Sequence, residues 1–191
     1  MKIGILGSGN VGKALSRGVT RAGHEVQLVH RDPAAMREAV QWADAIVLAI
    51  PFTAIESVVN RIGDGFDGKI VIDVTNTLTP DHKFAELSHS SGAERLQAMI
   101  PHARVIKAFN TVFAQHMDTG RVGDKPLTAL IAGDDVQAKQ AVIELASGIG
   151  FDPVDAGPLA NARMIESMAF LNIQLGYGLG MGTQIGFHLH H

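Results

Sequence analysis

The amino-acid sequence predicts an α/β fold, in which a doubly wound, mostly parallel sheet is followed by a C-terminal helical extension. Short apolar runs alternate along most of the chain with helically periodic segments about 10–15 residues long, which is the pattern of a parallel sheet. The run at residues 45–50 is apolar throughout, as expected for a strand buried on both faces. A glycine-rich G-x-G-x-x-G sequence at residues 7–12 joins the first apolar run to the first helical segment.

Capping residues set the helix boundaries in the first half of the chain. Gly23 is suited to end the first helix, which starts at the glycine-rich turn. Asp32 is a typical N-cap, and Pro33 follows it at the first helical position. Thr53 and Glu56 match a capping box for the next helix. The strands expected around these helices are residues 3–6, 24–29, 45–50 and 69–73.

The second half of the chain continues the alternation after a long loop at residues 75–90. Ser91 and Glu94 form a second capping box for a helix that ends near residue 100. Asp134 or Asp135 caps a later helix. Pro153 confines the last strand to a sheet edge, because proline cannot donate to a central ladder. The expected strands are residues 104–108, 127–132 and 151–155.

A domain boundary is predicted near residue 157. Residues 1–156 form the predicted sheet domain, and from residue 158 the chain reads as one helical segment to the C-terminus. We therefore divide the chain into residues 1–156 and a helical segment at 157–191.

The composition excludes several classes of protein. The net charge is −3 and no basic run exceeds two adjacent residues, which argues against a nucleic-acid partner. The chain has no cysteine, so it has no disulfide and no thiol nucleophile. No apolar stretch is long enough to cross a bilayer, and the chain begins directly with a strand. We therefore expect a cytoplasmic protein without a membrane partner or signal peptide.

The histidines do not predict a metal site. Four of them lack metal-ligand spacing: His82, His89, His102 and His116. The terminal His188, His190 and His191 could belong to an expression tag. No metal is expected.

The glycine-rich turn predicts a dinucleotide site. A strand, a glycine turn and a helix together present backbone N–H groups and a helix N-terminus to a pyrophosphate. Gly7 would make the tight turn, Gly9 would let the backbone approach the phosphates, and Gly12 would let the helix pack closely on the strand. The whole turn is expected to bind the cofactor: Gly7, Ser8, Gly9, Asn10, Val11 and Gly12.

Further cofactor-binding residues are expected at the carboxyl ends of the other strands, where ligands bind in such sheets. Pro51 and Phe52 could wall a nicotinamide ring or simply start a helix. Asn76 and Asn110 could hold its amide or ribose, or serve only as turn residues. The full set is His30, Arg31, Ile50, Pro51, Phe52, Asn76, Ala108, Phe109 and Asn110.

Arg31 favours NADP(H) over NAD(H). Sites for NAD usually end the second strand with Asp or Glu, whereas here His30 and Arg31 occupy that place. A guanidinium can bind a 2′-phosphate with two parallel hydrogen bonds. Asp32 is the main objection, but it is better explained as the cap before Pro33. A solvated surface arginine is the alternative.

The sequence shows no convincing catalytic acid–base pair, so the catalytic residues are left unassigned. Lys107 could be a general acid or a structural lysine. The single tyrosine, Tyr177, lies in a glycine-rich segment near the C-terminus. Hydride transfer to a ring needs no obligatory protein acid or base, because the cofactor carries the chemistry.

The C-terminal segment combines a helical apolar period with repeated glycines. Each interior glycine costs a helix about 1 kcal/mol relative to alanine, so such a run needs a close partner. A dimer interface, an acceptor-ring site and a loose tail are the alternatives. The glycines are Gly176, Gly178, Gly180, Gly182 and Gly186.

Several of these motifs together resemble the NADP oxidoreductase family typified by coenzyme F420 (deazaflavin)-dependent enzymes. They are also similar to the cytosolic NADPH-binding domain of the STEAP metalloreductases. The resemblance implies a Rossmann domain, NADP(H), hydride transfer to a flavin-like ring and homodimers formed by the C-terminal helices. The segments that carry it are residues 7–12, 22–26, 30–31, 107–111 and 155–163.

The leading hypothesis is an NADP(H)-dependent oxidoreductase that passes hydride between NADPH and a flavin, a deazaflavin or a similar small-molecule ring acceptor. Two alternatives stay open: a reductase of a small imine or carbonyl compound, and a non-catalytic NADPH-binding sensor or module.

Overall fold

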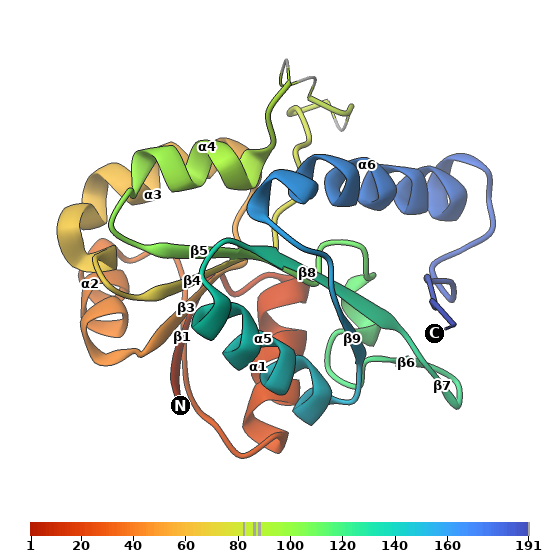
Figure 1. Cartoon of the computed structure of the whole chain (residues 1–191), viewed down its shortest axis with the longest axis horizontal. Coiled ribbons are helices and arrows are strands. Elements are labelled where there is room, and N and C mark those ends of the chain that lie inside the picture. The colour runs from red at the N-terminus through yellow and green to blue at the C-terminus, as the bar shows by residue number, and fades with distance from the viewer. Residues whose placement is uncertain (82, 86, 88, 191) are drawn as a thin grey trace.

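The computed structural model describes residues 1–81, 83–85, 87 and 89–190, and it shows a three-layer α/β arrangement (Figure 1). His82 and His191, which were considered above, lie outside the described residues. A seven-stranded sheet has the order β2-β1-β3-β4-β5-β8-β9. Its strands are β1 (Lys2–Leu6), β2 (Glu25–Val29), β3 (Ala45–Leu48), β4 (Ile70–Asp73), β5 (Arg104–Lys107), β8 (Thr128–Gly133) and β9 (Asp152–Asp155).

Every pairing in this sheet is parallel except that of β5 with β8. The mostly parallel, doubly wound sheet predicted from the sequence is therefore confirmed. The edge position of the last strand is also confirmed, since β9 pairs with β8 alone.

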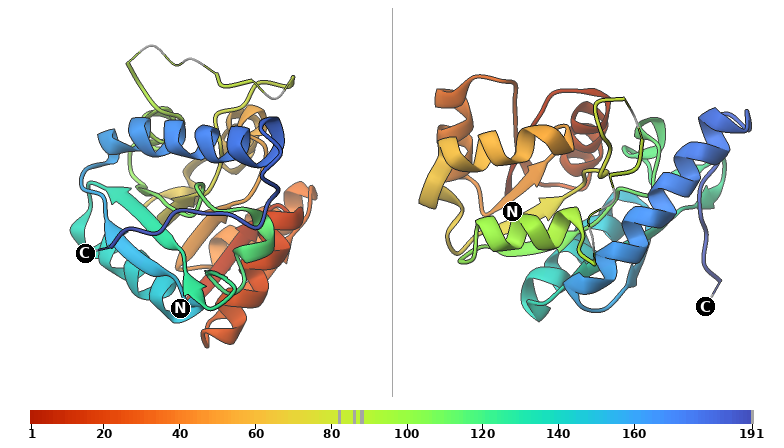
Figure 2. Two further views of the ribbon diagram at one scale, coloured as in Figure 1. Left: turned by 90° about the vertical axis from the view of Figure 1, so that its right-hand side faces the viewer. Right: turned by 90° about the horizontal axis from the view of Figure 1, so that it is seen from above.

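Helices cover both faces of the sheet (Figures 1 and 2). Helices α1 and α5 pack on one face, and α2, α3, α4 and α6 lie on the other. Their bounds are α1 (Asn10–Arg21), α2 (Pro33–Trp42), α3 (Ile55–Ile62), α4 (Gly92–Met99), α5 (Val136–Ile149) and α6 (Ala162–Ile173).

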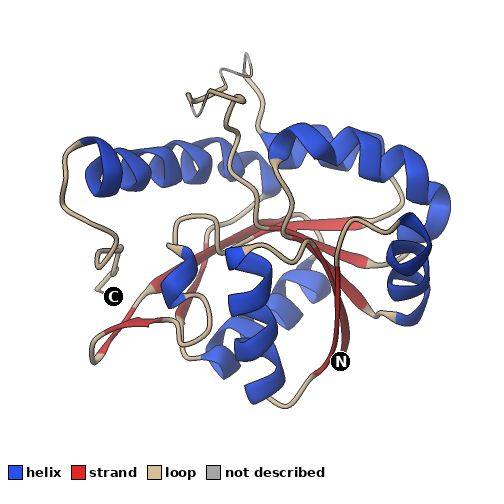
Figure 3. Cartoon of the chain, turned by 180° about the vertical axis from the view of Figure 1, so that it is seen from behind, coloured by secondary structure: helices blue, strands red, loops and turns tan. Residues whose placement is uncertain are grey.

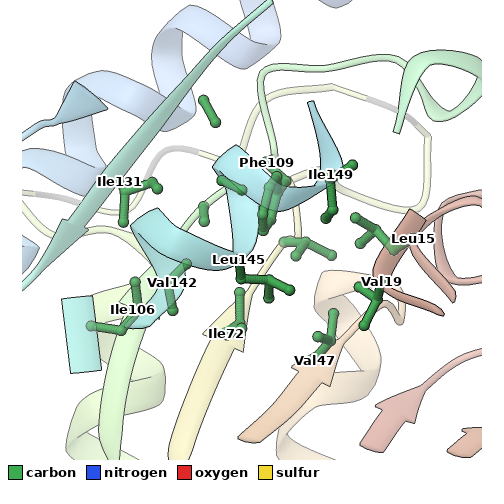
Figure 4. Close-up of a cluster of buried hydrophobic side chains, with 14 of the residues drawn as sticks. Leu15, Val19, Val47, Ile72, Ile106, Phe109, Ile131, Val142, Leu145 and Ile149 are labelled. Carbon is green, nitrogen blue, oxygen red and sulfur yellow. The ribbon is translucent and has the colours of Figure 1, made fainter. Parts of the chain in front are cut away.

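Two apolar cores hold these layers together, one on each face of the sheet. The core under α1 and α5 contains Leu15, Val142, Ile72 and Ile106, all buried (Figure 4). The other core joins α2, α3 and α4 to the sheet and includes Phe66 and Leu96. The central strands are buried on both faces, which explains why their sequences are almost continuously apolar.

Local capping mostly follows the sequence. Asp32, Ser91 and Asp135 each cap a helix, with the Asp135 Oδ1 accepting from Ala138 N at 2.7 Å. The capping box expected at Thr53 is wrong. A 3-10 turn at Phe52–Ala54 precedes α3, the N-cap is Ala54, and no side chain caps this helix.

The C-terminal segment is helical only in part. Helix α6 ends at Ile173 and runs into a π-helical turn, Gln174–Gly178. Residues 179–190 are not helical, so the expectation of one helix to the C-terminus is wrong. They return along β8, where Thr128 N donates to Phe187 O at 2.9 Å. The sequence also gave no sign of the hairpin β6 (Arg121–Val122) and β7 (Lys125–Pro126) (Figure 3).

Close contacts within the chain explain why some of the C-terminal positions are glycine. A Cβ on Gly176 would lie 2.6 Å from the Phe113 ring, and a Cβ on Gly186 would lie 2.5 Å from Leu127. Gly180 and Gly182 have φ of 72° and 75°, which ends the helical period. The loose-tail alternative is therefore wrong for residues that pack on Phe113 and Leu127.

Two classes of feature are absent from the described part of the chain. None of its helices is long and apolar enough to cross a membrane. The same residues contain no group of three or more metal-ligating side chains.

Candidate dinucleotide-binding site

A cleft of about 540 Å³ opens at the carboxyl ends of β1, β3 and β4. The chain changes direction across the sheet here, since β2 lies on one side of β1 and β3 on the other. Such a switch point is where ligands bind in open α/β sheets. Seven of the predicted cofactor residues line the cleft: Gly9, Asn10, Val11, Ile50, Pro51, Phe52 and Asn76.

The glycine-rich turn is shaped by backbone contacts that side chains would prevent. Gly7 has φ of 113°, and a Cβ there would overlap the carbonyl group of Ala49. A Cβ on Gly12 would overlap the Gly7 carbonyl oxygen, so this glycine lets α1 pack directly against the turn. By contrast, a Cβ on Gly9 would meet nothing within 4 Å. The space above Gly9 is thus open to a ligand.

The N-terminus of α1 is suited to an anion. Gly9 is its N-cap, and no side chain caps the helix there. The first N–H groups of a helix need acceptors, and the helix dipole favours negative charge at this end. The N-terminus of α1 therefore faces the open space above Gly9 with donors to offer, as pyrophosphate binding requires.

Beside this turn, His30 and Arg31 directly follow the end of β2. The His30 Nδ1 lies 2.7 Å from the Ser8 hydroxyl, which ties the end of β2 to the glycine turn. Arg31 is exposed, and no ion pair of its side chain occurs within the described residues. The Asp32 Oδ1 accepts from Ala34 N at 2.8 Å, as expected for a cap. Its carboxylate is therefore engaged by the helix.

Unsatisfied polar atoms lie near the other end of the cleft, on Thr75, which lines it, and on Asn110, which does not line it but contacts the lining residue Asn76. The Asn110 Nδ2 donates to the Asn76 Oδ1 at 3.3 Å, which joins the ends of β5 and β4. The Asn110 Oδ1 and the Thr75 Oγ1 are buried without a hydrogen-bond partner. Such atoms are rare in folded proteins and usually mark a place for water or a ligand. A carboxamide would supply the missing donor to Asn110.

Ala108 and Phe109 do not line the cleft. Both are buried in the core, where the Phe109 ring packs on Phe151 with centroids 5.3 Å apart. Phe109 has φ of 63°, a left-handed conformation that is costly for a bulky residue. This conformation turns the chain so that Asn110 reaches Asn76 while the ring stays in the core.

Lys107 is a buried ion-pair centre beneath the cleft. Its ammonium lies 2.9 Å from the Asp73 Oδ2 and 3.1 Å from the Glu166 Oε1, and it donates to Thr75 O at 2.7 Å. Glu166 also accepts from Gly92 N at 2.9 Å, at the start of α4. The network therefore joins β4, β5, α4 and α6.

Burial by itself lowers the pKa of the Lys107 ammonium, but the charges of Asp73 and Glu166 outweigh it and raise this pKa above its usual range. The ammonium stays charged at neutral pH, and the structural alternative for Lys107 is the better one. Asp73 and Glu166 carried no signal in the sequence, because only the fold brings α6 to β5.

The described residues that line the cleft include no acid or base. None of the described residues that line it has a titratable side chain, and most of the lining is apolar. Part of this lining carries no recognisable signal in the sequence, namely Leu78, Thr79 and Pro80 in the loop after β4.

A glycine turn between the first strand and helix of a doubly wound sheet, with a cleft at the switch point, defines a dinucleotide-binding domain of the Rossmann class. The family model described as "NADP oxidoreductase coenzyme F420-dependent" matches residues 2–77. Over this segment the chain is similar to that family.

Individual proteins are similar to longer parts of the chain. Metalloreductase STEAP3 of Rattus norvegicus is 34% identical over 87% of this chain, and the chain spans 36% of that relative's length. A solved structure from Arthrobacter sp. FB24, proposed to be an F420-dependent NADP reductase, has a TM-score of 0.90 and 26% identity, with 100% of both chains covered. A hypothetical protein from Sinorhizobium meliloti has a TM-score of 0.74 and 30% identity, with 84% of this chain and 86% of that chain covered.

Proposed function

We propose that this protein is an NADPH-dependent oxidoreductase that transfers hydride between NADPH and a flavin, deazaflavin or similar ring acceptor. We infer a ring acceptor from the lining of the cleft, since none of its described residues has a titratable side chain. Reduction of an imine or carbonyl group benefits from a positioned acid, whereas a ring acceptor can take its proton from water.

The residues at the cleft fit NADPH in one orientation. The open space at Gly9 and the N-terminus of α1 would hold the pyrophosphate, and Arg31 with His30 would hold the 2′-phosphate. Asn110 and Asn76 would then hold the nicotinamide amide, which satisfies the orphaned Asn110 Oδ1. When bound, NADPH supplies the hydride, and the apolar walls at Ile50, Pro51 and Phe52 exclude water from its ring.

An acceptor panel tests this function. NADPH oxidation should be followed with the purified protein and FMN, FAD, a deazaflavin or a ferric chelate. Rapid oxidation with a ring acceptor is the expected result. Tight NADPH binding without oxidation by any ring would overturn the proposal in favour of a sensor. Faster turnover of a cyclic imine than of any ring would favour the imine reductase alternative.

Arg31→Ala should weaken NADPH binding about 10–100-fold, because hydrogen bonds to charged groups contribute roughly 1.5–3 kcal/mol. NADH lacks the 2′-phosphate, so its dissociation constant should stay almost unchanged. Titration calorimetry with both nucleotides measures the two effects. Arg37→Ala is the matched control, since Arg37 is a nearby cation on α2 that contacts Arg61 O. Equal losses for NADPH and NADH would refute the role of Arg31.

The C-terminal part supports a proposal about assembly. Met164 and Leu171 lie two turns apart on α6, and their side chains are 60% and 51% exposed. Exposed apolar residues on one helix face favour a protein partner. We place a homodimer interface on residues 157–191, with residues 1–156 as the cofactor-binding domain in a cytoplasmic protein. Sedimentation velocity measures the dimer directly, and a monomer at micromolar concentration would contradict it.

A further inference from the structure

The start of helix α4 lies against one wall of the cleft. Phe52 lines the cleft and is partly buried against the core on that face of the sheet. Gly92, the first residue of α4, is buried beside the Phe52 ring, and a Cβ there would lie 2.9 Å from the ring atom Cε2. The same Cβ would lie 2.7 Å from the Thr77 Cγ2. Gly92 itself does not line the cleft, so the site described above gives it no role.

The backbone at Gly92 does not require glycine. The residue is helical and its φ is not positive, so another residue would not be strained there. Alanine is also a better helix former than glycine. The lack of a side chain at this position is therefore explained by the room that the Phe52 ring and the Thr77 methyl group need.

Gly92 is held in place by a residue of another helix. The Glu166 Oε2 on α6 accepts from Gly92 N at 2.9 Å, and the Glu166 Oε1 accepts from Ala93 N at 3.2 Å. Glu166 is itself buried and pairs with Lys107 at 3.1 Å. The start of α4 is therefore anchored to the ion-pair network beneath the cleft.

A side chain at position 92 would displace the Phe52 ring rather than the helix. The Cε2 atom lies at the far end of a side chain that can rotate, whereas Gly92 is fixed by its hydrogen bond to Glu166. The open space beside the ring is the cleft. Thr77 follows Asn76, so the contacts of Gly92 lie at the end of the cleft where the nicotinamide is placed.

We propose that Gly92 is a positioning residue for the nicotinamide, because it leaves room for the Phe52 ring beside α4 and so sets the width of the cleft at that end. The proposal rests on the proposed function, since it concerns NADPH bound in the orientation given above. Glu166 and Lys107 contribute by keeping Gly92 where it is.

Gly92→Ala should weaken NADPH binding about three- to tenfold and lower kcat with a ring acceptor by about tenfold or more, because small misplacements of a reacting group are costly. Adenosine 2′,5′-bisphosphate carries a 2′-phosphate but no nicotinamide, so its dissociation constant should stay within about twofold of the wild-type value. Titration calorimetry measures both affinities, and NADPH oxidation gives kcat and KM separately.

Two double variants show which neighbour of Gly92 transmits the effect. Phe52→Leu removes the ring atom that the new Cβ would meet, and Thr77→Ser removes the methyl group. In the Phe52→Leu background, Gly92→Ala should change NADPH affinity by less than about twofold, whereas the full loss should remain in the Thr77→Ser background. The Phe52→Leu background also serves if Gly92→Ala alone fails to fold. Rescue by Thr77→Ser but not by Phe52→Leu would overturn the proposal.

Gly18→Ala is the matched control, because its Cβ would lie 2.9 Å from Asp118 O on a part of α1 that does not line the cleft. It should leave the affinities for both ligands unchanged. Equal weakening of NADPH and the bisphosphate in Gly92→Ala, or no weakening of either, would overturn this proposal, and ring turnover by the wild type would leave the proposed function standing. Selective loss of NADPH affinity, in a protein that oxidises NADPH with no ring acceptor, would support the role of Gly92 and overturn the proposed function.

Discussion

Lys107→Met should destabilise the protein by about 3–5 kcal/mol, the usual cost of leaving buried charges without their partner. Asp73 and Glu166 would remain in the core, where the Lys107, Asp73 and Glu166 side chains are at most 2% exposed. For a domain of this size the melting temperature should fall by roughly 10 °C or more. Urea unfolding, analysed as a two-state transition, measures the free energy directly.

Lys139→Met is the control, because the Lys139 side chain, 12% exposed, pairs at 2.8 Å with Asp155, whose side chain is 52% exposed and can be hydrated without its partner. Its cost should stay below about 1 kcal/mol. The triple variant Asp73→Asn, Lys107→Met, Glu166→Gln should recover part of the loss, since it removes the unpaired charges. A cost for Lys107→Met as small as that of the control would show that water reaches the network.

The contribution of Lys107 to the free energy of unfolding depends on pH in a way that follows from its raised pKa. A group whose pKa is raised by folding contributes fully below its unfolded pKa, which is about 10.4 for lysine. The contribution is lost only as pH rises through the folded-state pKa. The destabilisation by Lys107→Met should therefore be complete throughout the neutral range.

The partners of Lys107 could not be predicted from the sequence, whereas most of the helix caps could. The caps at Asp32, Ser91 and Asp135 could be predicted because they depend on residues two or three positions away. The cap at Thr53 failed because Pro51 starts a 3-10 turn instead, with Ala54 N donating to Pro51 O at 2.9 Å. The partners of Lys107 come from β4 and α6, which only the completed fold brings together.

In the candidate site, too, the positions of residues could be predicted better than the directions of their side chains. The residues that directly follow strands β1, β3 and β4 could be placed at the cleft, because parallel strands end at one edge of the sheet. The direction of a side chain after a strand was harder to predict. Phe109 was expected to bind the cofactor, yet its left-handed conformation accompanies a ring buried in the core, and only Asn110 lies near the cleft. A helix was expected from residue 158 to the C-terminus, although repeated glycines interrupt the apolar period, and Gly180 and Gly182 turn the chain there.

Gly9→Val and Gly12→Ala should fail in different ways, although both alter the same motif. Gly12→Ala should cost about 3 kcal/mol of stability or more, because its Cβ overlaps the Gly7 carbonyl oxygen and neither backbone segment can move freely. A Cβ at Gly9 meets nothing within 4 Å, so Gly9→Val should fold nearly as well as wild type. Its valine would fill the space where the pyrophosphate is expected, and NADPH binding should weaken about 10–100-fold.

Thermal unfolding and NADPH titration, run on both variants, separate the two roles. Gly18→Ala on the same helix is a useful reference, since its Cβ would approach Asp118 far from the turn and should affect stability without direct loss of affinity. Normal NADPH affinity in Gly9→Val would show that the cofactor does not use this turn, whatever its sequence. A stable Gly12→Ala would show instead that α1 can shift away from Gly7. The packing of the protein does not require a glycine at position 9, which is why the two variants separate ligand binding from stability.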